Sequence, residues 1–591
     1  YINQKQMGAY YTKEDITEYI SKNSVIPFLF DAARAKCKVA FDNPNGPTVW
    51  DLLRKDPDRY IYDAMKKGVD LPLPKNIVAG LDTKKPNLLE RRKDWNKPAA
   101  EEFALPTETW REVVARRQRC EEIRKKLAAG EVREISDFIT LNLDLRQFAQ
   151  DVIQNCEGPD LLMAFWQAIT TITILDPTGG SGAFIFAALN ILDPLYEACL
   201  DRMEAFLAEW GEAGKKLHPN YHKKFTEVLA RVDAHPNRRY FVLKSIILNN
   251  LYAVDIMEEA VEICKLRLFL KLAAQVEPDA TRDNLGIEPL PDIDFNIRAG
   301  NTLVGYATYE EVKKAVTSTL DFDNAAENIA LKAADLQQTF DKFRELQTEG
   351  DGSVPAADKR ELQKRLMALE AELNRHLAAQ YDVASRDKAA YAKWLVSHQP
   401  FHWFIQYHGI LSRGGFDVII GNPPYVEYSK INNIYRIHNY ETEDCGNLYA
   451  YVMERSTHLL HNHAYLGIIV PHSVAGTYRS QSLQAFILHY FQGVLSFYTR
   501  RPGKLFDGAD QCLCIFVGIK DRLASGNWSS TYYRWCTAAR EFLFPTLAFV
   551  KSDTNNLWKR FNVLPKLGED IELRIMAKLI KQKPLATYLT E

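Results

Sequence analysis

Apolar and polar residues follow two patterns along the chain, and the first predicts an α/β sheet. Between about 170 and 310, and again between about 413 and 520, short apolar runs are followed by longer amphipathic segments. Thr171–Leu175 leads into a glycine-rich turn and then into the apolar run Ala183–Leu189, which is the order strand, tight turn and helix. Three further runs are typical of strands: Phe416–Ile420, Leu466–Val470 and Cys512–Val517. We therefore predict one α/β domain with a wound parallel sheet, interrupted between its two halves.

The second pattern, between about 325 and 395, repeats every ~3.5 residues and predicts a helical hairpin with a coiled-coil-like seam. One arm carries Leu336, Phe340 and Phe343, and Gly350–Pro355 supplies the turn. The other arm carries Leu362, Leu366, Leu369, Leu373 and Leu377. The pattern alone favours a structural spacer or a docking surface inserted into the α/β domain.

The composition indicates a globular protein with several cores and no membrane partner. The chain has 591 residues, 46% apolar and 25% charged, and neither a secretory signal nor an apolar run of about 18 residues is visible. The cytoplasm is therefore the expected location. The nine cysteines lack metal-ligand spacing, so we expect no metal site and buried, reduced thiols. The formal charge of -2 gives no nucleic-acid signature, so any DNA contact needs local basic surface.

The turn after the first predicted strand has the features of a cofactor pocket. Asp176–Phe184 reads Asp-Pro-Thr-Gly-Gly-Ser-Gly-Ala-Phe and lies where open α/β sheets bind ligands. Its glycines let the backbone approach a bound molecule, and free N–H groups at the helix start can meet a carboxylate. The turn lacks the Lys-Ser/Thr of a phosphate-binding loop, which disfavours ATP. Tight packing of the helix on the strand would also require glycines.

Two later segments are candidates to complete this pocket. Asp255 follows the apolar run Leu251–Val254, where a carboxylate can accept both hydroxyls of a ribose, but a helix N-cap explains this residue equally well. It lies much farther from Gly180 than the ~20 residues of a dinucleotide fingerprint, which disfavours NAD. Asn301 ends another apolar stretch, from which its amide could meet the adenine ring of a nucleoside cofactor.

The most specific signal is Asn422-Pro423-Pro424-Tyr425, directly after a predicted strand. These residues resemble the hallmark loop of the amino-methylating DNA methyltransferases, and the motif order, with Gly8–Thr12 ahead of the others, is similar to their gamma arrangement. The resemblance implies a Rossmann-like S-adenosylmethionine-dependent methyltransferase fold with a helical N-terminal region. It also implies N6 methylation of an adenine that is flipped out of double-stranded DNA.

The loop suits that chemistry, because the amino nitrogen of adenine is a poor nucleophile. The Asn422 side-chain oxygen and the Pro423 carbonyl can accept its hydrogens, while the prolines hold the loop rigid and Tyr425 stacks on the flipped base. Phe506 resembles the second aromatic wall of the family, although a core residue at a strand entrance would look the same. Three basic residues before it are expected to bind DNA phosphates: Arg500, Arg501 and Lys504.

The resemblance also assigns the remaining cofactor contacts. Tyr11 and Thr12 would cover the methionine end of S-adenosylmethionine. Two positions depart from the family: Gly179 stands where relatives commonly have Cys, and Asn301 where many have Asp. The full set expected at the cofactor is Tyr11, Thr12, Asp176, Pro177, Thr178, Gly180, Gly182, Phe184, Asp255, Ile256, Asn301 and Asn422.

At finer grain, Leu105–Arg111 and Phe404–Tyr425 resemble the large adenine methyltransferases of type IIG restriction systems and of BREX or DISARM phage-defence islands. No Asp…Glu-x-Lys nuclease core is visible, which favours the defence islands and, with them, other defence proteins as partners. Two alternatives stay open: an N4-cytosine or small-molecule methyltransferase, and a non-catalytic subunit that binds cofactor and DNA.

The implied division of the chain has five parts. They are an N-terminal helical region at 1–155 with the cofactor-covering segment, a first half of the methyltransferase core at 156–324, the inserted hairpin at 325–395, a second half with the catalytic loop at 396–525, and the start of a target-recognition region at 526–591.

Overall fold

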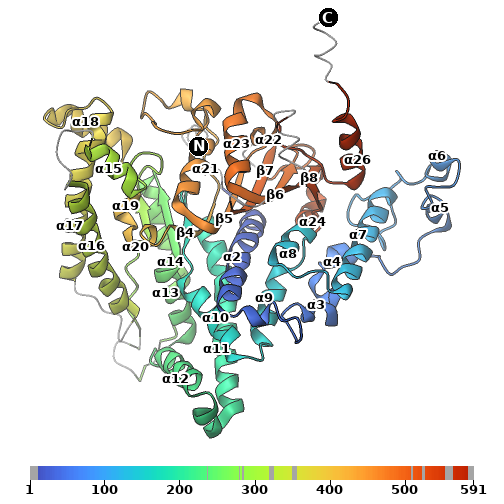
Figure 1. The fold of residues 1–591 in the computed structure, drawn as a ribbon, viewed down its shortest axis with the longest axis horizontal. Coiled ribbons are helices and arrows are strands. Elements are labelled where there is room, and N and C mark those ends of the chain that lie inside the picture. Colours follow the sequence, from blue (N-terminus) through green and yellow to red (C-terminus); the bar gives the residue numbers. More distant parts are fainter. Residues whose placement is uncertain are drawn as a thin grey trace, which may run out of the picture.

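A computed structural model of the chain contains a mixed β-sheet with helices on both faces (Figure 1). It describes residues 11–235, 237–278, 280–281, 285, 287–317, 325–348, 356–506, 510–521, 526–552, 559 and 563–583. The expected α/β class with a Rossmann-like core is confirmed.

Within these residues the sheet has nine strands in the order β3-β2-β1-β4-β5-β7-β6-β8-β9. The pairs from β3 to β5 are parallel, whereas β7 runs antiparallel between β5 and β6. The central strands read as continuous apolar runs because helices cover both faces. The strands are β1 (Ile174–Asp176), β2 (Leu251–Asp255), β3 (Ile297–Ala299), β4 (Phe416–Gly421), β5 (Leu460–Pro471), β6 (Phe491–Tyr498), β7 (Leu513–Lys520), β8 (Asn527–Tyr533) and β9 (Phe549–Ser552).

The strand order reverses at β1, and this fixes where a ligand can bind. Ile174 of β1 pairs with Leu251 of β2 on one side and with Val418 of β4 on the other. The connections from neighbouring strands therefore separate at the carboxyl ends of β1 and β4, which is where open α/β sheets form their crevice.

Helices α2, α9, α10, α11 and α13 share the largest hydrophobic cluster with one face of the sheet. Their bounds are α2 (Glu14–Lys36), α9 (Leu145–Gln154), α10 (Pro159–Thr171), α11 (Ala183–Leu217) and α13 (Arg238–Asn249). Helix α2 packs on β5 at Gly467, where a Cβ atom would lie 2.3 Å from Ser24 Oγ and 2.7 Å from Ile20 Cγ2. Because no larger residue fits, this contact sets the position of α2 and of the residues before it.

The opposite face packs against α21 (Leu448–Leu459) and α23 (Gln481–Tyr490). Beside it stand α15 (Tyr309–Thr317), α16 (Ala325–Thr348), α17 (Ala356–Gln380) and α18 (Lys388–His398) with a cluster of their own. Helices α16 and α17 form the predicted hairpin, and its seam leucines from Leu362 to Leu377 are buried. The expected turn Gly350–Pro355 lies outside the described residues.

The chain after residue 525 continues the sheet instead of starting a separate unit. β8 pairs in parallel with β6, and β9 pairs antiparallel with β8. Sheet pairing therefore crosses the boundary expected between 396–525 and 526–591. Beyond it, α26 (Asp570–Leu579) is the amphipathic helix that follows.

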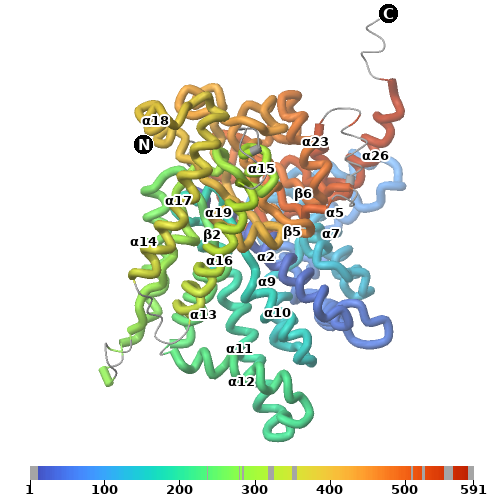
Figure 2. The backbone as a smooth tube through the Cα atoms, turned by 60° about the vertical axis from the view of Figure 1, so that its left-hand side comes forward, coloured from blue at the N-terminus to red at the C-terminus, as the bar shows by residue number. Residues whose placement is uncertain are grey.

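Helix α11 extends far from the sheet and turns into α12 (Pro219–Asp233) in both views (Figure 1, Figure 2). In the described part of the chain it is the one helix long and apolar enough to cross a membrane, although the sequence predicted none. Since 72% of its apolar window is buried inside the protein, its length and composition are those of a core helix.

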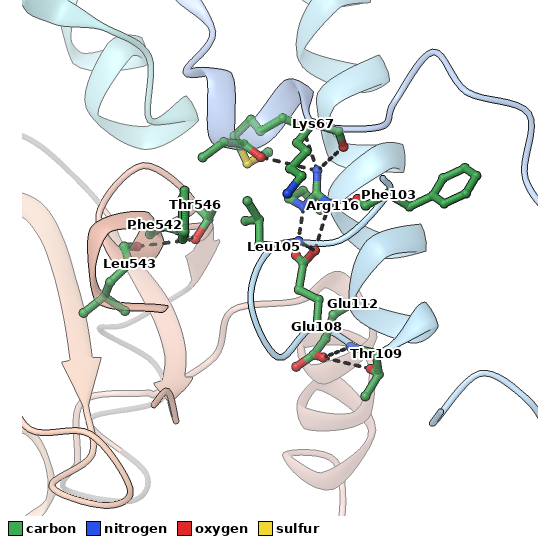
Figure 3. Close-up of polar contacts among 12 residues, drawn as sticks. Lys67, Phe103, Leu105, Glu108, Thr109, Glu112, Arg116, Phe542, Leu543 and Thr546 are labelled. Carbon is green, nitrogen blue, oxygen red and sulfur yellow. Dashed lines mark hydrogen bonds and ion pairs between the residues drawn. The ribbon is translucent and has the colours of Figure 1, made fainter. Parts of the chain in front are cut away.

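The N-terminal region is held by a buried arginine (Figure 3). Arg116, on α7 (Trp110–Ala129), is 7% exposed and forms two 2.8 Å hydrogen bonds to the Glu108 carboxylate. It also donates to the backbone oxygens of Phe103 and Lys67, at 2.7 Å each. The segment around Glu108 that the sequence singled out is thus fixed by one guanidinium group.

Replacing Arg116 by Ala is therefore expected to lower the free energy of unfolding by about 3–5 kcal/mol, because it leaves the Glu108 carboxylate half-buried without its partner. Denaturant unfolding followed by circular dichroism measures this. The control is Arg365→Ala, whose ion pairs to Asp335 and Glu361 are exposed and contribute less than about 1 kcal/mol. Equal losses in the two variants would contradict the role of Arg116.

Candidate active site

The glycine-rich turn between β1 and α11 has two packed glycines and one open one. At Gly179 a Cβ atom would lie 2.9 Å from Ala253 Cβ of β2. At Gly182, with φ +85°, a Cβ atom would lie 2.5 Å from Cys264 Sγ, so this glycine serves the packing of α11 on α14 (Glu258–Ala273). At Gly180, with φ +49°, a Cβ atom would meet nothing within 4 Å. Space for a ligand is therefore available at Gly180.

Asp255, at the end of β2, ties the second strand to this turn. Its Oδ2 accepts a 2.8 Å hydrogen bond from the Gly180 N–H, and its Oδ1 accepts one of 2.8 Å from the Met257 N–H at the start of α14. The carboxylate thus contacts the backbone just ahead of α14 with one oxygen and the glycine-rich turn with the other, and it is not the N-cap of α14. Ile256, expected at the cofactor, is half-buried beside it.

A second carboxylate, that of Asp176, lies close to the carboxylate of Asp255. Asp176 is 1% exposed, and burial raises the pKa of its carboxyl group to about 8 against the opposing hydrogen bonds of Thr178, with a smaller contribution from the charge of Asp255. Burial also raises the pKa of Asp255. In the described part of the chain neither carboxylate forms an ion pair with Lys, Arg or His. Such a pair of acids suits a cationic ligand.

The loop after β3 packs against the same turn. The Gly300 N–H donates to Asp255 O at 2.8 Å, and the Thr302 hydroxyl donates to Pro177 O. Asn301 is 3% exposed; its Oδ1 accepts from the Leu303 N–H, while its Nδ2 is buried and makes no hydrogen bond. An unpartnered amide donor is therefore held close to the turn.

The tetrapeptide loop leaves β4 directly beside Asp176. A Cβ atom at Gly421 would lie 2.9 Å from Asp176 Oδ1, so only glycine permits this approach. Asn422 donates from Nδ2 to Thr12 Oγ1 at 3.0 Å, while its Oδ1 is buried and accepts no hydrogen bond. Thr12 is 5% exposed, immediately ahead of α2. The Asn422 amide is therefore fixed at Nδ2, whereas its acceptor Oδ1 has no partner among the described residues.

Tyr425 is half-buried, and its ring packs against the clusters on both faces of the sheet. Its hydroxyl donates to Ile469 O of β5 at 3.1 Å. Pro423 is buried and Pro424 half-buried, so the loop is held against the sheet.

The remaining predicted residues differ in their burial. Phe506 is 1% exposed within the largest core cluster, as the core alternative expects, and Phe184 is 2% exposed in the same cluster. Both side chains are therefore buried in the core. Tyr11, by contrast, is 69% exposed, and Gly8–Tyr10 of the same expected segment lie outside the described residues.

The three predicted phosphate contacts are exposed, but two share a carboxylate. Arg500 and Arg501 lie 3.5 and 4.0 Å from Asp510 Oδ2, while Lys504 is exposed at the same bend. A DNA phosphate would have to compete with Asp510 for these arginines.

Sequence reasoning missed Gly421 and Thr302, which bring the loops together. Gly421 lies between the predicted strand Phe416–Ile420 and the tetrapeptide, and only the pairing of β1 with β4 reveals its function. No group of three His, Cys, Asp or Glu side chains that could hold a metal occurs among the described residues. All nine cysteines are free, and seven are buried.

Comparison with known proteins connects this site to DNA modification. Residues 249–497 match the family model of the Eco57I restriction-modification methylase. A protein of Methanocaldococcus jannaschii, named as a type II restriction enzyme and methyltransferase, is 27% identical over 404 residues, covering 61% of this chain and 31% of that protein. The chain thus spans less than a third of this relative.

Among solved structures, the DrdV–DNA complex has a TM-score of 0.31 at 11% identity, with 91% of this chain and 44% of that chain covered. The M protein of the type I restriction enzyme EcoKI has a TM-score of 0.28 at 9% identity, with 94% and 93% covered. Scores this low support no comparison of individual residues. The family match, which spans Asp255, Asn301 and the loop at Asn422, relates this part of the chain to the Eco57I restriction-modification methylases.

Proposed function

We propose that this chain is the adenine-methylating part of a restriction-modification or phage-defence enzyme. It transfers a methyl group from S-adenosylmethionine to N6 of an adenine flipped out of double-stranded DNA. Of the systems that the sequence resembles, the BREX and DISARM defence islands remain our preferred assignment, and the cytoplasm the expected location.

The observation that carries the proposal is the buried, unpartnered oxygen of Asn422. Leaving a buried acceptor unsatisfied costs about 1–3 kcal/mol, and an amino group of a base would satisfy it. Because Nδ2 donates to Thr12, the oxygen is the end of the amide that is available to a substrate. A donor-only group such as the adenine amino group fits this end.

The loop would activate that amino group by accepting its two hydrogens at Asn422 Oδ1 and at the Pro423 carbonyl. This would favour a pyramidal nitrogen with a localised lone pair, and rigid placement supplies most of the rate enhancement. Tyr425 offers a ring face to the flipped base, while its hydroxyl stays bonded to Ile469 O.

The pocket around Gly180 fits S-adenosylmethionine, which supplies an electrophilic methyl group on a cationic sulfur when bound. Asp255 would hold the ribose, and Asp176 would favour the positive charge of the ligand. The unpartnered Asn301 Nδ2 would donate to the adenine ring of the cofactor. Tyr11 and Thr12 would cover the methionine end.

The direct test is to incubate the chain with radiolabelled S-adenosylmethionine and duplex DNA of mixed sequence, then to digest the DNA to nucleosides. We expect label in N6-methyl-2′-deoxyadenosine. Label in N4-methyl-2′-deoxycytidine would contradict the choice of base, since the same acceptors suit both amino groups. DNA that stays unlabelled although cofactor and DNA bind would favour a non-catalytic subunit.

Asn422→Ala is expected to lower turnover by about 10²–10³-fold, the effect of removing one preorganised group from a charged transition state. Affinities for DNA and cofactor should stay nearly unchanged, because the contribution is largest in the transition state. Single-turnover kinetics with equilibrium binding separates the two effects.

Tyr425 variants provide the matched comparison, because this residue holds the base instead of activating it. Tyr425→Phe keeps the ring face and should stay active, whereas Tyr425→Ala loses stacking worth about 1–3 kcal/mol. The fluorescence of 2-aminopurine at the target position reports base placement. Near-normal turnover in Asn422→Ala, or a Phe variant as inactive as the Ala variant, would contradict this division of roles.

The raised pKa of Asp176, about 8, predicts that cofactor affinity depends on pH. At neutral pH the ligand-free carboxyl group is largely protonated, and a cationic ligand favours its ionised form, so binding releases a proton. Affinity should therefore rise by up to about tenfold per unit from roughly pH 6.5 to roughly pH 8. Titration calorimetry in buffers of different ionisation enthalpy measures how many protons are released when the cofactor binds. Asp176→Asn should abolish the dependence; the same pH profile in that variant would contradict the assignment.

A further inference from the structure

A second group of side chains meets at the same edge of the sheet as the catalytic loop. His472 directly follows β5, Tyr532 belongs to β8, and Lys566 lies in the segment before α26. The rings of His472 and Tyr532 are 5.7 Å apart. Lys566 Nζ lies 5.8 Å from the centre of the Tyr532 ring and 5.7 Å from that of Phe497. All but Phe497 are half-buried.

The group is positively charged and lacks a counter-ion. Lys566 forms no ion pair with any residue that the structure describes. Burial lowers its pKa, and the groups that oppose this are the thiols of Cys514 and Cys512. The Tyr532 hydroxyl is hydrogen-bonded to the Cys512 side chain, and the positive charges of Arg500 and Arg534 lie near enough to act on it. A half-buried lysine without a carboxylate partner is unfavourable in isolation, and an anion would offset the penalty.

The group lies close to Tyr425, because strand β5 carries both the carbonyl that Tyr425 contacts and the start of the segment with His472. The Tyr425 hydroxyl donates to Ile469 O at 3.1 Å, and His472 lies three residues farther along the same chain. At ~3.3 Å per residue this is a separation of about 10 Å. A DNA strand whose base stacks on Tyr425 would pass this group with its backbone, and backbone phosphates are the anions that such proteins neutralise.

We propose that Lys566, with His472 and Tyr532, binds a backbone phosphate of the DNA beside the flipped base, an inference that rests on the proposed function. Lys566 supplies the charge, and the phenol and the imidazole supply neutral hydrogen-bond donors. The Phe497 and Tyr532 rings lie 5.7 and 5.8 Å from the lysine Nζ and help to position it. Unlike Arg500 and Arg501, which a phosphate must first separate from Asp510, Lys566 has no carboxylate partner among the described residues with which a phosphate would compete.

The test is Lys566→Gln in the whole chain, with duplex DNA binding followed by fluorescence anisotropy over a range of salt concentrations. One lost phosphate contact lowers the slope of log affinity against log salt by about 0.9. Over a fourfold rise in salt, the variant should therefore lose about 3.5-fold less affinity than the wild type. Lys566→Arg should keep the wild-type slope.

Lys551→Gln is the matched control, because this exposed lysine on the neighbouring strand β9 has no such site. It should leave the slope unchanged, and calorimetry should give the same cofactor affinity for all variants.

Three outcomes would contradict the proposals. If Lys566→Gln keeps the wild-type slope and affinity while the wild-type protein binds and methylates DNA, this inference is overturned and the proposed function stands. Loss of thermal stability and of cofactor binding in both Lys566 variants would show a structural role instead. A wild-type chain that neither binds nor methylates DNA would overturn the proposed function itself.

Discussion

The parallel pairing of β1 with β4 is the constraint on which the rest of the site depends. It brings together two segments separated by the inserted hairpin and by much of the first half of the sheet. Because both strands end at the same edge, the glycine-rich turn and the tetrapeptide loop start side by side. The missing side chain of Gly421 then lets the loop approach Asp176. Any larger residue would separate the pocket that fits the cofactor from the amide that is proposed to act on the base.

The contact between α2 and β5 places the N-terminal segment beside the two loops. The close packing of α2 on β5 at Gly467 carries Thr12 to the carboxyl edge of the sheet, where its hydroxyl accepts from Asn422. The side chain that the family resemblance assigned to the cofactor thus contacts the amide of Asn422. One residue far from the loop in sequence connects the two halves of the proposed chemistry.

Local pattern was sufficient for the elements but not for their pairing. The apolar runs located β1, β4 and β5 within a few residues, and the leucine spacing located α16 and α17. The run Cys512–Val517 also located β7. The antiparallel direction of β7 and the added strands β8 and β9 could not be predicted, because strand order and direction depend on contacts between distant segments. Phe506 shows a related limit, since a phenylalanine suits a core and a stacking wall equally well. The ion pair between Asp510 and Arg500 likewise became apparent only from the structure.

The continuation of the sheet through β8 and β9 limits how a recognition region could be exchanged between relatives. A fragment ending at 525 would leave the buried strand β6 as an unprotected edge, which favours aggregation. The chain stays attached well beyond that point, because Ser529 Oγ donates to Leu567 O at 2.7 Å and the Leu564 N–H donates to Ala475 O at 2.8 Å. Recombination, natural or engineered, is therefore least disruptive when the junction falls after Leu567, because the sheet then keeps β8 and β9 beside β6.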